Sequence, residues 1–174
     1  PVCPLQPVHA VPYLIDTLRK ADDASITICP IGPLTNIAQA LSLAPDIGRA
    51  IKNIVLMGGN YFEAGNITPA AEFNFYVDPH AAQVVLQSGV PIAILPLDVT
   101  HKATSTTPRM DVLRQQPNAN GSRLAGILQS YERFDTQKFG LEGGPLHDPC
   151  AIAYAVFPEF FSGRDCHVAV ETQS

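Results

Sequence analysis

The sequence predicts an α/β protein with an open, mainly parallel sheet flanked by helices. Three short, continuously apolar runs have the character of buried strands, and segments with helical spacing alternate with them along the chain. This alternation is typical of βαβ units, in which neighbouring strands run parallel. Because the 174 residues contain no evident linker or internal repeat, we expect residues 1–174 to form a single domain.

Proline, glycine and aspartate set the expected boundaries of these elements. Asp78-Pro79 and Asp148-Pro149 each predict a helix start, because aspartate caps a helix and proline suits its first turn. Gly89 ends one helix, Gly32-Pro33 ends the first strand, and alternating apolar residues from His167 to Glu171 predict a terminal strand. In chain order, we expect a helix over 8–20, a strand over 26–31, a helix over 34–43, a strand over 53–57, a glycine-rich loop through 69, a helix over 78–88, a strand over 91–97, and helices from 107, over 121–138 and over 148–157.

The composition favours a well-buried globular protein. Hydrophobic residues make up 46% of the chain, charged residues make up 16%, and the net charge is −5. A negative charge disfavours a nucleic-acid partner, and no apolar run is long enough to span a bilayer. Cys3, Cys29, Cys150 and Cys166 match no zinc or redox spacing, so we expect buried free thiols in a reducing cytoplasm.

Polar side chains follow each predicted strand. Thr35-Asn36 follow the first strand, Asn66, Glu72 and Asn74 the second, and Asp98 and Thr100 the third. Because the carboxyl ends of parallel strands share one edge of a sheet, we expect these groups to surround one crevice. The carboxamides and carboxylate after the second strand suit a hydroxyl-rich ligand such as a sugar. The same residues are also typical of turns, and this alternative stays open.

A second candidate group is His147-Asp148-Pro149. An isolated Asp-Pro is typical of a helix cap, as at Asp78-Pro79. The adjacent histidine and the preceding glycine-rich loop favour a function instead. A carboxylate suits calcium or magnesium, and a histidine can donate a proton to a leaving group. We interpret the other histidines as structural or solvent-facing: His9, His80, His101 and His167.

Taken together, these motifs resemble the inosine-uridine preferring nucleoside hydrolase family. They occur in the family's order and cover nearly the whole chain: Ile31-Gly32-Pro33-Leu34-Thr35-Asn36, Met57-Gly58-Gly59, Gly65-Asn66, Glu72-Phe73-Asn74, Asp78-Pro79, Leu97-Asp98-Val99-Thr100 and Leu146-His147-Asp148-Pro149-Cys150. The resemblance implies an open α/β fold. It also implies hydrolysis of the N-glycosidic bond of ribonucleosides, with one calcium ion (Ca2+) as cofactor.

The resemblance further implies which residues carry the chemistry. Asp148 would be a calcium ligand that also touches ribose hydroxyls, and the backbone carbonyl of Ile31 would be another ligand. His147 would donate a proton to the departing base. The remaining ribose contacts would come from Met57, Asn66, Glu72 and Asn74. One predicted helix face would border the base pocket or would be a plain amphipathic surface: Tyr131, Asp135 and Phe139.

The family's N-terminal cluster of the Asp-x-Asp-x-x-x-Asp-Asp kind has no match in this sequence, and Asp22-Asp23 has different surroundings. One carboxylate and one carbonyl cannot fill a calcium shell of about six to eight oxygens. We therefore expect the chain to be the central and C-terminal portion of a hydrolase domain, without its N-terminal segment and C-terminal end. By itself it should be inactive.

Two other classes of function remain alternatives. The chain could be a non-catalytic module that binds nucleosides or sugars, or a structural subunit that pairs with a catalytic homologue. The resemblance implies a homodimer or homotetramer that acts on small-molecule ribonucleosides. It leaves the choice between purine and pyrimidine bases open.

Overall fold

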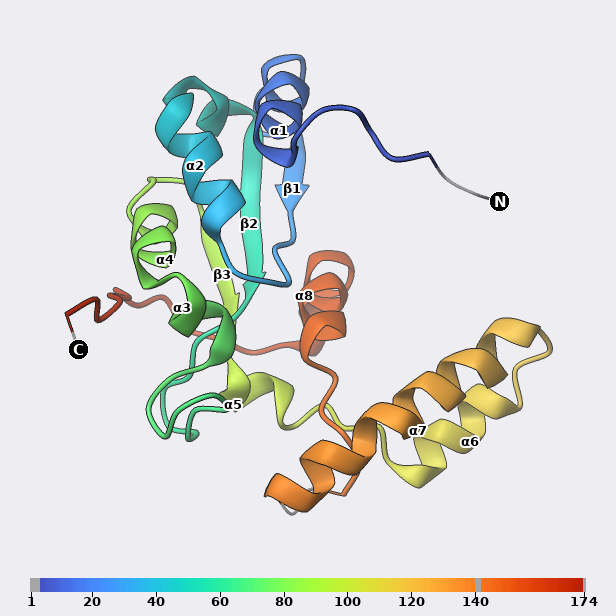
Figure 1. Cartoon of the computed structure of the whole chain (residues 1–174). Coiled ribbons are helices and arrows are strands. Elements are labelled where there is room, and N and C mark those ends of the chain that lie inside the picture. The colour runs from blue at the N-terminus through green and yellow to red at the C-terminus, as the bar shows by residue number, and fades with distance from the viewer. Residues whose placement is uncertain (1–3, 140–141, 174) are drawn as a thin grey trace.

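The computed structural model describes residues 4–139 and 142–173, and this part of the chain contains a parallel sheet of three strands. Their order is β1 (Ile26–Ile28), β2 (Ile51–Met57) and β3 (Ile92–Leu95), so β2 lies in the centre. Ile54 of β2 is paired with Ile28 on one side and Ile92 on the other. The predicted class, an open parallel sheet flanked by helices, is confirmed (Figure 1).

Helices join and cover these strands. The α-helices are α1 (Ala10–Arg19), α2 (Thr35–Leu43), α3 (Phe73–Val77), α4 (Pro79–Leu86), α5 (Leu97–Thr100), α6 (Thr107–Arg114), α7 (Ala119–Phe139) and α8 (His147–Val156). Two 3₁₀ turns complete the described elements: η1 (Pro45–Ala50) and η2 (Pro158–Phe160). Within the described residues, none of the helices combines the length and apolar character that a membrane crossing requires.

The alternating side chains of β2 divide the core between the two faces of the sheet. Ile54 and Leu56 pack with buried residues of α1, α2 and α4. Val55 and Met57 pack on the other face, against Ala151 of α8. Figure 1 shows α2 and α4 on one side of the strands and α8 on the other. The central strand thus links two apolar clusters, and α8 reaches the sheet close to the carboxyl end of β2.

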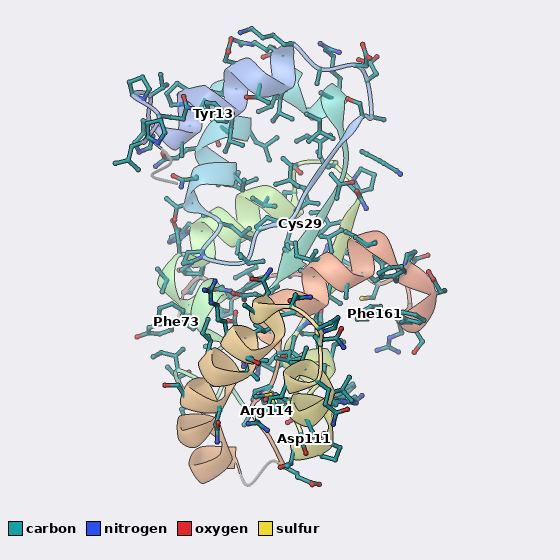
Figure 2. The ribbon with its side chains drawn as sticks, turned by 90° about the vertical axis from the view of Figure 1, so that its right-hand side faces the viewer. Tyr13, Cys29, Phe73, Asp111, Arg114 and Phe161 are labelled. Carbon is teal, nitrogen blue, oxygen red and sulfur yellow. The ribbon has the colours of Figure 1, made fainter. Side chains whose placement is uncertain are left out.

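A hairpin of α6 and α7 lies to one side of the sheet (Figure 1). Arg114 of α6 bonds to Asp111 at 2.7 Å within the same helix, and its Nη2 donates to Oε1 of Gln129 on α7 at 3.2 Å. Figure 2 shows the Arg114–Asp111 pair on this hairpin, away from the strands. The side chains of Tyr131, Asp135 and Phe139 lie outside the described residues, so their expected place at the base pocket stays a prediction.

Prolines shorten two of the predicted strands. We expected strands over 26–31 and 91–97, but the structure has them over Ile26–Ile28 and Ile92–Leu95. Pro30 and Pro96 have no N–H group for a ladder and lie just past these ends. Leu97 begins the short helix α5 instead of ending a strand. The predicted helices over 8–20, 34–43 and 78–88 are confirmed with slightly shorter bounds.

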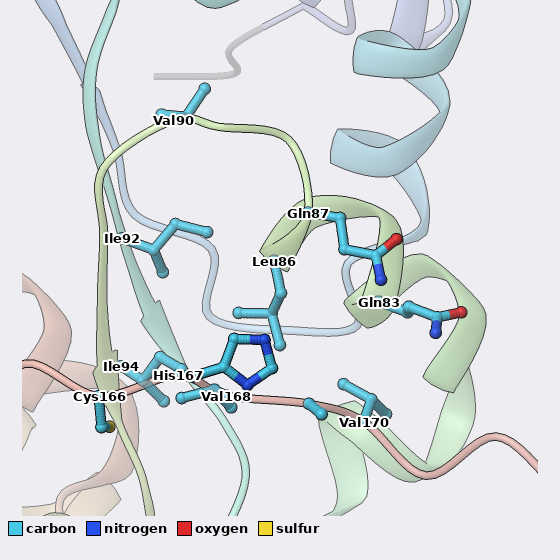
Figure 3. A pocket seen from close by; sticks show the side chains of 11 residues that line it. Gln83, Leu86, Gln87, Val90, Ile92, Ile94, Cys166, His167, Val168 and Val170 are labelled. Carbon is cyan, nitrogen blue, oxygen red and sulfur yellow. The ribbon is translucent and has the colours of Figure 1, made fainter.

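The predicted terminal strand over His167–Glu171 is wrong. Residues 161–173 form no helix or strand in the described part of the chain. Val168 and Val170 are half-buried between exposed neighbours, and Val170 packs against the core. This segment, α4 and β3 line a pocket of about 260 Å³, which Figure 3 shows from close by. The alternation therefore reflects an extended chain on an apolar surface, without backbone pairing to a neighbouring strand.

The described cysteines are free thiols, as expected, but not all are buried. Cys150 is buried, Cys29 is half-buried and Cys166 is exposed. Burial raises the pKa of the Cys150 and Cys29 thiols. These two cysteines therefore behave as small apolar side chains within the core.

A matched pair of valines on α4 tests the packing of this layer. Val85 is 0% exposed and Val84 is 39% exposed. We expect Val85→Ala to lower the free energy of unfolding by about 2–3 kcal/mol, because buried methyl groups are lost and a cavity remains. Val84→Ala should change it by less than about 0.5 kcal/mol. Urea unfolding followed by circular dichroism measures both, and equal losses would contradict this assignment of the buried face.

Candidate functional site

The carboxylate of Glu72 joins the end of β2 to the start of α3. Its Oε1 accepts a hydrogen bond from the backbone N–H of Asn74 at 2.9 Å. Its Oε2 accepts from the N–H groups of Gly59 at 2.9 Å and Phe75 at 3.2 Å. Glu72 is only 2% exposed and caps α3. Hydrogen bonds to an ionised carboxylate are strong, so this side chain fixes the loop that leaves the sheet.

Three other predicted ribose contacts lie around this carboxylate. Nδ2 of Asn74 donates to the carbonyl of Met57 at 3.1 Å and lies 3.5 Å from its sulfur. Oδ1 of Asn66 accepts from the backbone N–H of Phe73 at 2.8 Å. The structure therefore brings Met57, Asn66, Glu72 and Asn74 into one connected group. These hydrogen bonds also show that the two carboxamides organise the loop, as the alternative of turn-forming residues predicted.

The Gly58-Gly59 pair allows this close approach. A Cβ atom on Gly58 would lie 2.6 Å from the Phe75 ring and 3.3 Å from Oε2 of Glu72. Gly59 has φ of +75°, a left-handed conformation that favours glycine. The two glycines let the backbone turn directly under α3, which brings the Gly59 N–H within reach of Glu72.

Asp98 holds the outer part of the same loop. Its Oδ2 accepts from the backbone N–H of Tyr61 at 2.9 Å, and its Oδ1 accepts from those of Phe62 at 2.8 Å and Glu63 at 3.2 Å. Desolvation opposes the charged form, but these donors outweigh it and lower the pKa of Asp98. Asp98 therefore lies beside the loop that follows β2. Its carboxylate is engaged in holding that loop.

His147 lies against the segment that follows β3. Its Nδ1 is 2.8 Å from Oγ1 of Thr100, which is completely buried. Its ring also meets the ring of His101 edge-on, with 5.8 Å between centroids. Leu146 donates its N–H to the carbonyl of Ala103 at 2.7 Å, which fixes the start of α8. The N-terminus of α8 is thereby held at the carboxyl end of β3.

Asp148 is not the helix cap that its Asp-Pro sequence predicted. Helix α8 begins one residue earlier, at His147, and Leu146 is its N-cap without a side-chain hydrogen bond. The carboxylate of Asp148 is exposed, and it accepts no hydrogen bond from the residues that the structure describes. Desolvation by surrounding atoms raises its pKa. This carboxylate therefore does not cap α8.

The second predicted calcium contact is the backbone carbonyl of Ile31. Ile31 is exposed just beyond β1, and the preceding carbonyl of Pro30 accepts from the N–H of Met57 at 3.0 Å. Within residues 4–139 and 142–173, no group of three or more His, Cys, Asp or Glu side chains is arranged to hold a metal ion. The calcium contacts expected of Asp148 and of the Ile31 carbonyl stay a prediction.

The sequence did not predict the contacts around His147. Thr100 was expected at the crevice, but the sequence predicted no hydrogen-bond partner for it. His101 was expected to be structural or solvent-facing. His101 is half-buried, and its Nδ1 lies 3.4 Å from a carboxylate oxygen of Glu63. The signal available in the sequence was the position of Thr100 and His101 directly after a strand, on the edge that also receives His147.

Comparison with known proteins decides the family. The sequence model of the family described as inosine-uridine preferring nucleoside hydrolase matches residues 1–174. The chain belongs to this family. As a nucleoside hydrolase family member, it is 45% identical over 97% of its length to a protein named pyrimidine-specific ribonucleoside hydrolase RihA of Photobacterium profundum. It is 50% identical over 95% of its length to an uncharacterised protein of Schizosaccharomyces pombe.

Solved nucleoside hydrolases have the same fold. A purine-preferring ribonucleoside hydrolase from Gardnerella vaginalis superposes on the whole chain with a TM-score of 0.90 and 33% identity, over 56% of its own length. A plant nucleoside hydrolase, PpNRh1, covers 93% of the chain with a TM-score of 0.86 and 28% identity. The chain covers 54% of the Photobacterium protein, so it spans about half the length of the relatives it matches.

Replacing Glu72 tests the junction between β2 and α3 in this nucleoside hydrolase chain. Glu72→Gln keeps the shape but turns an NH₂ group toward backbone donors, so we expect a loss of about 1–3 kcal/mol in the free energy of unfolding. Urea titration measures this loss. The exposed Glu159→Gln is the control and should be neutral. Equal stabilities of the two variants would contradict the role given to Glu72.

Acid should weaken the loop that Asp98 holds. Because folding lowers the pKa of Asp98 from its ordinary value of 3.8, its contribution is present above that value and is lost as the pH falls through the folded pKa. We expect Asp98→Asn to reduce stability at pH 7 and to show less acid dependence below pH ~4 than the unmodified chain. Urea midpoints across pH 2–7 measure this, with Asp165→Asn in the exposed C-terminal segment as the control.

Proposed function

We propose that the protein containing this chain is a ribonucleoside hydrolase. It would cleave the N-glycosidic bond of a ribonucleoside and release ribose and the free base. The supporting observation is that the Thr100–His147 hydrogen bond holds the start of α8 at the sheet edge that carries the Glu72 group. His147, the polar loop and Asp148 would thus act together at one edge, where open α/β sheets bind ligands.

The residues after β2 would bind the ribose hydroxyls. Carboxamides both donate and accept hydrogen bonds. The two oxygens of Glu72 can accept about four hydrogen bonds, which is more than its backbone donors occupy. Asn74 and Glu72 are already oriented by the backbone, with exposed fractions of 8% and 2%. Met57 would pack near the sugar, and Asn66 would contribute a further polar contact. Binding would therefore need little reorganisation of this loop.

His147 would donate a proton to the departing base. Cleavage builds positive charge on the ribose ring, and protonation makes the base a better leaving group. The carboxylates at this edge would stabilise the positive charge as it develops. Water attack at C1′ then completes the hydrolysis, with the electron pair of the broken bond going to the base.

Calcium would be held in part by this chain. The Asp148 carboxylate and the backbone carbonyl of Ile31 are oxygen donors of the kind that calcium prefers. Asp148 is exposed and accepts no hydrogen bond from the described residues, which fits this role. When bound, calcium supplies Lewis-acid assistance to the attack of water. Since Asp148 is the one predicted carboxylate ligand in this sequence, the chain alone should not release ribose.

The relatives leave base preference open. One is named pyrimidine-specific and another purine-preferring. We propose small-molecule ribonucleosides as substrates without choosing between the two classes, and we keep the proposed homodimer or homotetramer and cytoplasmic location as predictions. A non-catalytic module that binds nucleosides is the second candidate function, because hydrogen bonds within the Glu72 group would organise a binding loop in either case.

Ribose release from inosine and uridine tests the proposal. The chain would be assayed with calcium, with a chelator, and after extension with the aspartate-bearing segment of a relative. We expect release only from the extended protein and only with calcium. Release by the chain alone would contradict the proposed inactivity, and nucleoside binding without release would favour the non-catalytic module.

Two histidine variants of the extended, active protein test the proposed proton donor. His147→Ala should lower kcat for nucleosides by about 10²–10⁴-fold, the usual contribution of a general acid. His80→Ala is the matched control, since His80 is exposed in the first turn of α4. An unchanged kcat in the His147 variant would remove this residue from the mechanism.

A further inference from the structure

We infer that Thr100 is the positioning residue for His147, and that its hydroxyl holds the imidazole in the orientation needed to protonate the departing base. This inference rests on the proposed hydrolase function. It adds one residue, Thr100, and one atom, its hydroxyl oxygen, to the proposed mechanism. Thr100 itself touches neither the substrate nor the reacting atoms.

The geometry around the imidazole carries this assignment. Oγ1 of Thr100 is 2.8 Å from Nδ1 of His147, a normal hydrogen-bond distance. Thr100 is 0% exposed, so bulk water does not compete for its hydroxyl. The edge-on contact with the His101 ring, at 60° between planes, supports the imidazole from a second direction. One hydrogen bond and one ring contact together restrict the tilt of the His147 ring.

Thr100 is in turn fixed by the sheet. Its helix α5 begins at Leu97, whose N–H donates to the carbonyl of Gly59 at 3.0 Å, in the loop that Glu72 organises. The N–H of Thr100 donates to the carbonyl of Pro96 at 3.1 Å, next to the end of β3. The hydroxyl therefore occupies a position set by two adjacent strands. A side chain held by rigid elements positions its partner more accurately than one on a loop.

The hydrogen bond also selects the nitrogen that reacts. With Nδ1 facing Thr100, proton transfer to the base is assigned to Nε2. The Nε2 proton passes to the base nitrogen as the C1′–N bond breaks and its electron pair moves to the base. Water adds to C1′ and gives up a proton, and the imidazole recovers a proton from solvent. A hydroxyl suits this cycle because its oxygen accepts from Nδ1–H both before and after the transfer.

A substrate comparison separates positioning from general structural support. In the calcium-dependent protein that contains this chain, Thr100→Val removes the hydroxyl with little change of volume. We expect kcat for inosine or uridine to fall by about 10–100-fold, since misplacement of a catalytic group has effects of this order. Hydrolysis of 4-nitrophenyl riboside should change by less than about threefold, because nitrophenolate departs without protonation. KM should stay unchanged for both substrates.

Three further variants complete the comparison. Thr100→Ser keeps the hydroxyl and should restore the rate for nucleosides to within about threefold of the unmodified protein. Thr100→Ala removes the hydroxyl without adding a methyl group and should repeat the pattern of the valine variant. Thr17→Val, at an exposed position on α1, controls for the loss of a hydroxyl elsewhere. Equal slowing of both substrates, or no slowing of either, would overturn the inference.

Ring spectra of the chain itself test the hydrogen bond without activity. Two-bond ¹H–¹⁵N correlation reports which imidazole nitrogen carries the proton, and His147→Gln identifies the signals of His147. We expect the Nδ1 shift to move in the valine and alanine variants but not in the serine or Thr17 variants. Coincident His147 signals in the unmodified chain and in Thr100→Val would overturn the inference. If the unmodified protein hydrolyses neither substrate, the proposed function fails, and these spectra alone decide the role of Thr100.

Discussion

The candidate site depends on one buried carboxylate. Glu72 accepts hydrogen bonds from the backbone of Gly59, at the end of β2, and from the first turn of α3. Without it, these N–H groups would lose their acceptor at the point where the chain leaves the sheet. The places of Asn74, through its bond to Met57, and of α5, through the bond from Leu97 to Gly59, both follow from this junction. The polar edge of the sheet is therefore organised before any ligand is present.

A second polar contact positions the start of α8, which packs on the other face of the sheet, at the same edge. Helix α8 packs through Ala151 on the side of β2 opposite to α2 and α4, so apolar packing alone would allow its start to shift along the strands. The Thr100–His147 hydrogen bond and the bond from Leu146 to Ala103 fix that start. Directional hydrogen bonds thus set the position of the chemical groups, whereas the apolar clusters set the layers.

The sequence predicted what depends on local pattern and missed what depends on contacts between distant segments. Apolar runs and helical spacing were sufficient for the parallel sheet and its flanking helices, and the position of polar residues after each strand was sufficient to gather Asn66, Glu72 and Asn74. The terminal strand over His167–Glu171 failed because alternation reports burial and not pairing. The hydrogen bond between Thr100 and His147 spans 47 positions along the chain, and no local pattern encodes it.

Three carboxylates at this edge show how environment divides their roles. Glu72 and Asp98 each accept hydrogen bonds from several backbone N–H groups, and in Asp98 those donors lower the pKa. Asp148 is desolvated without such donors from the described residues, and its pKa is raised. A cation beside Asp148 would favour its charged form. The same functional group therefore holds the loop at two positions and has no such backbone donors among the described residues at the third.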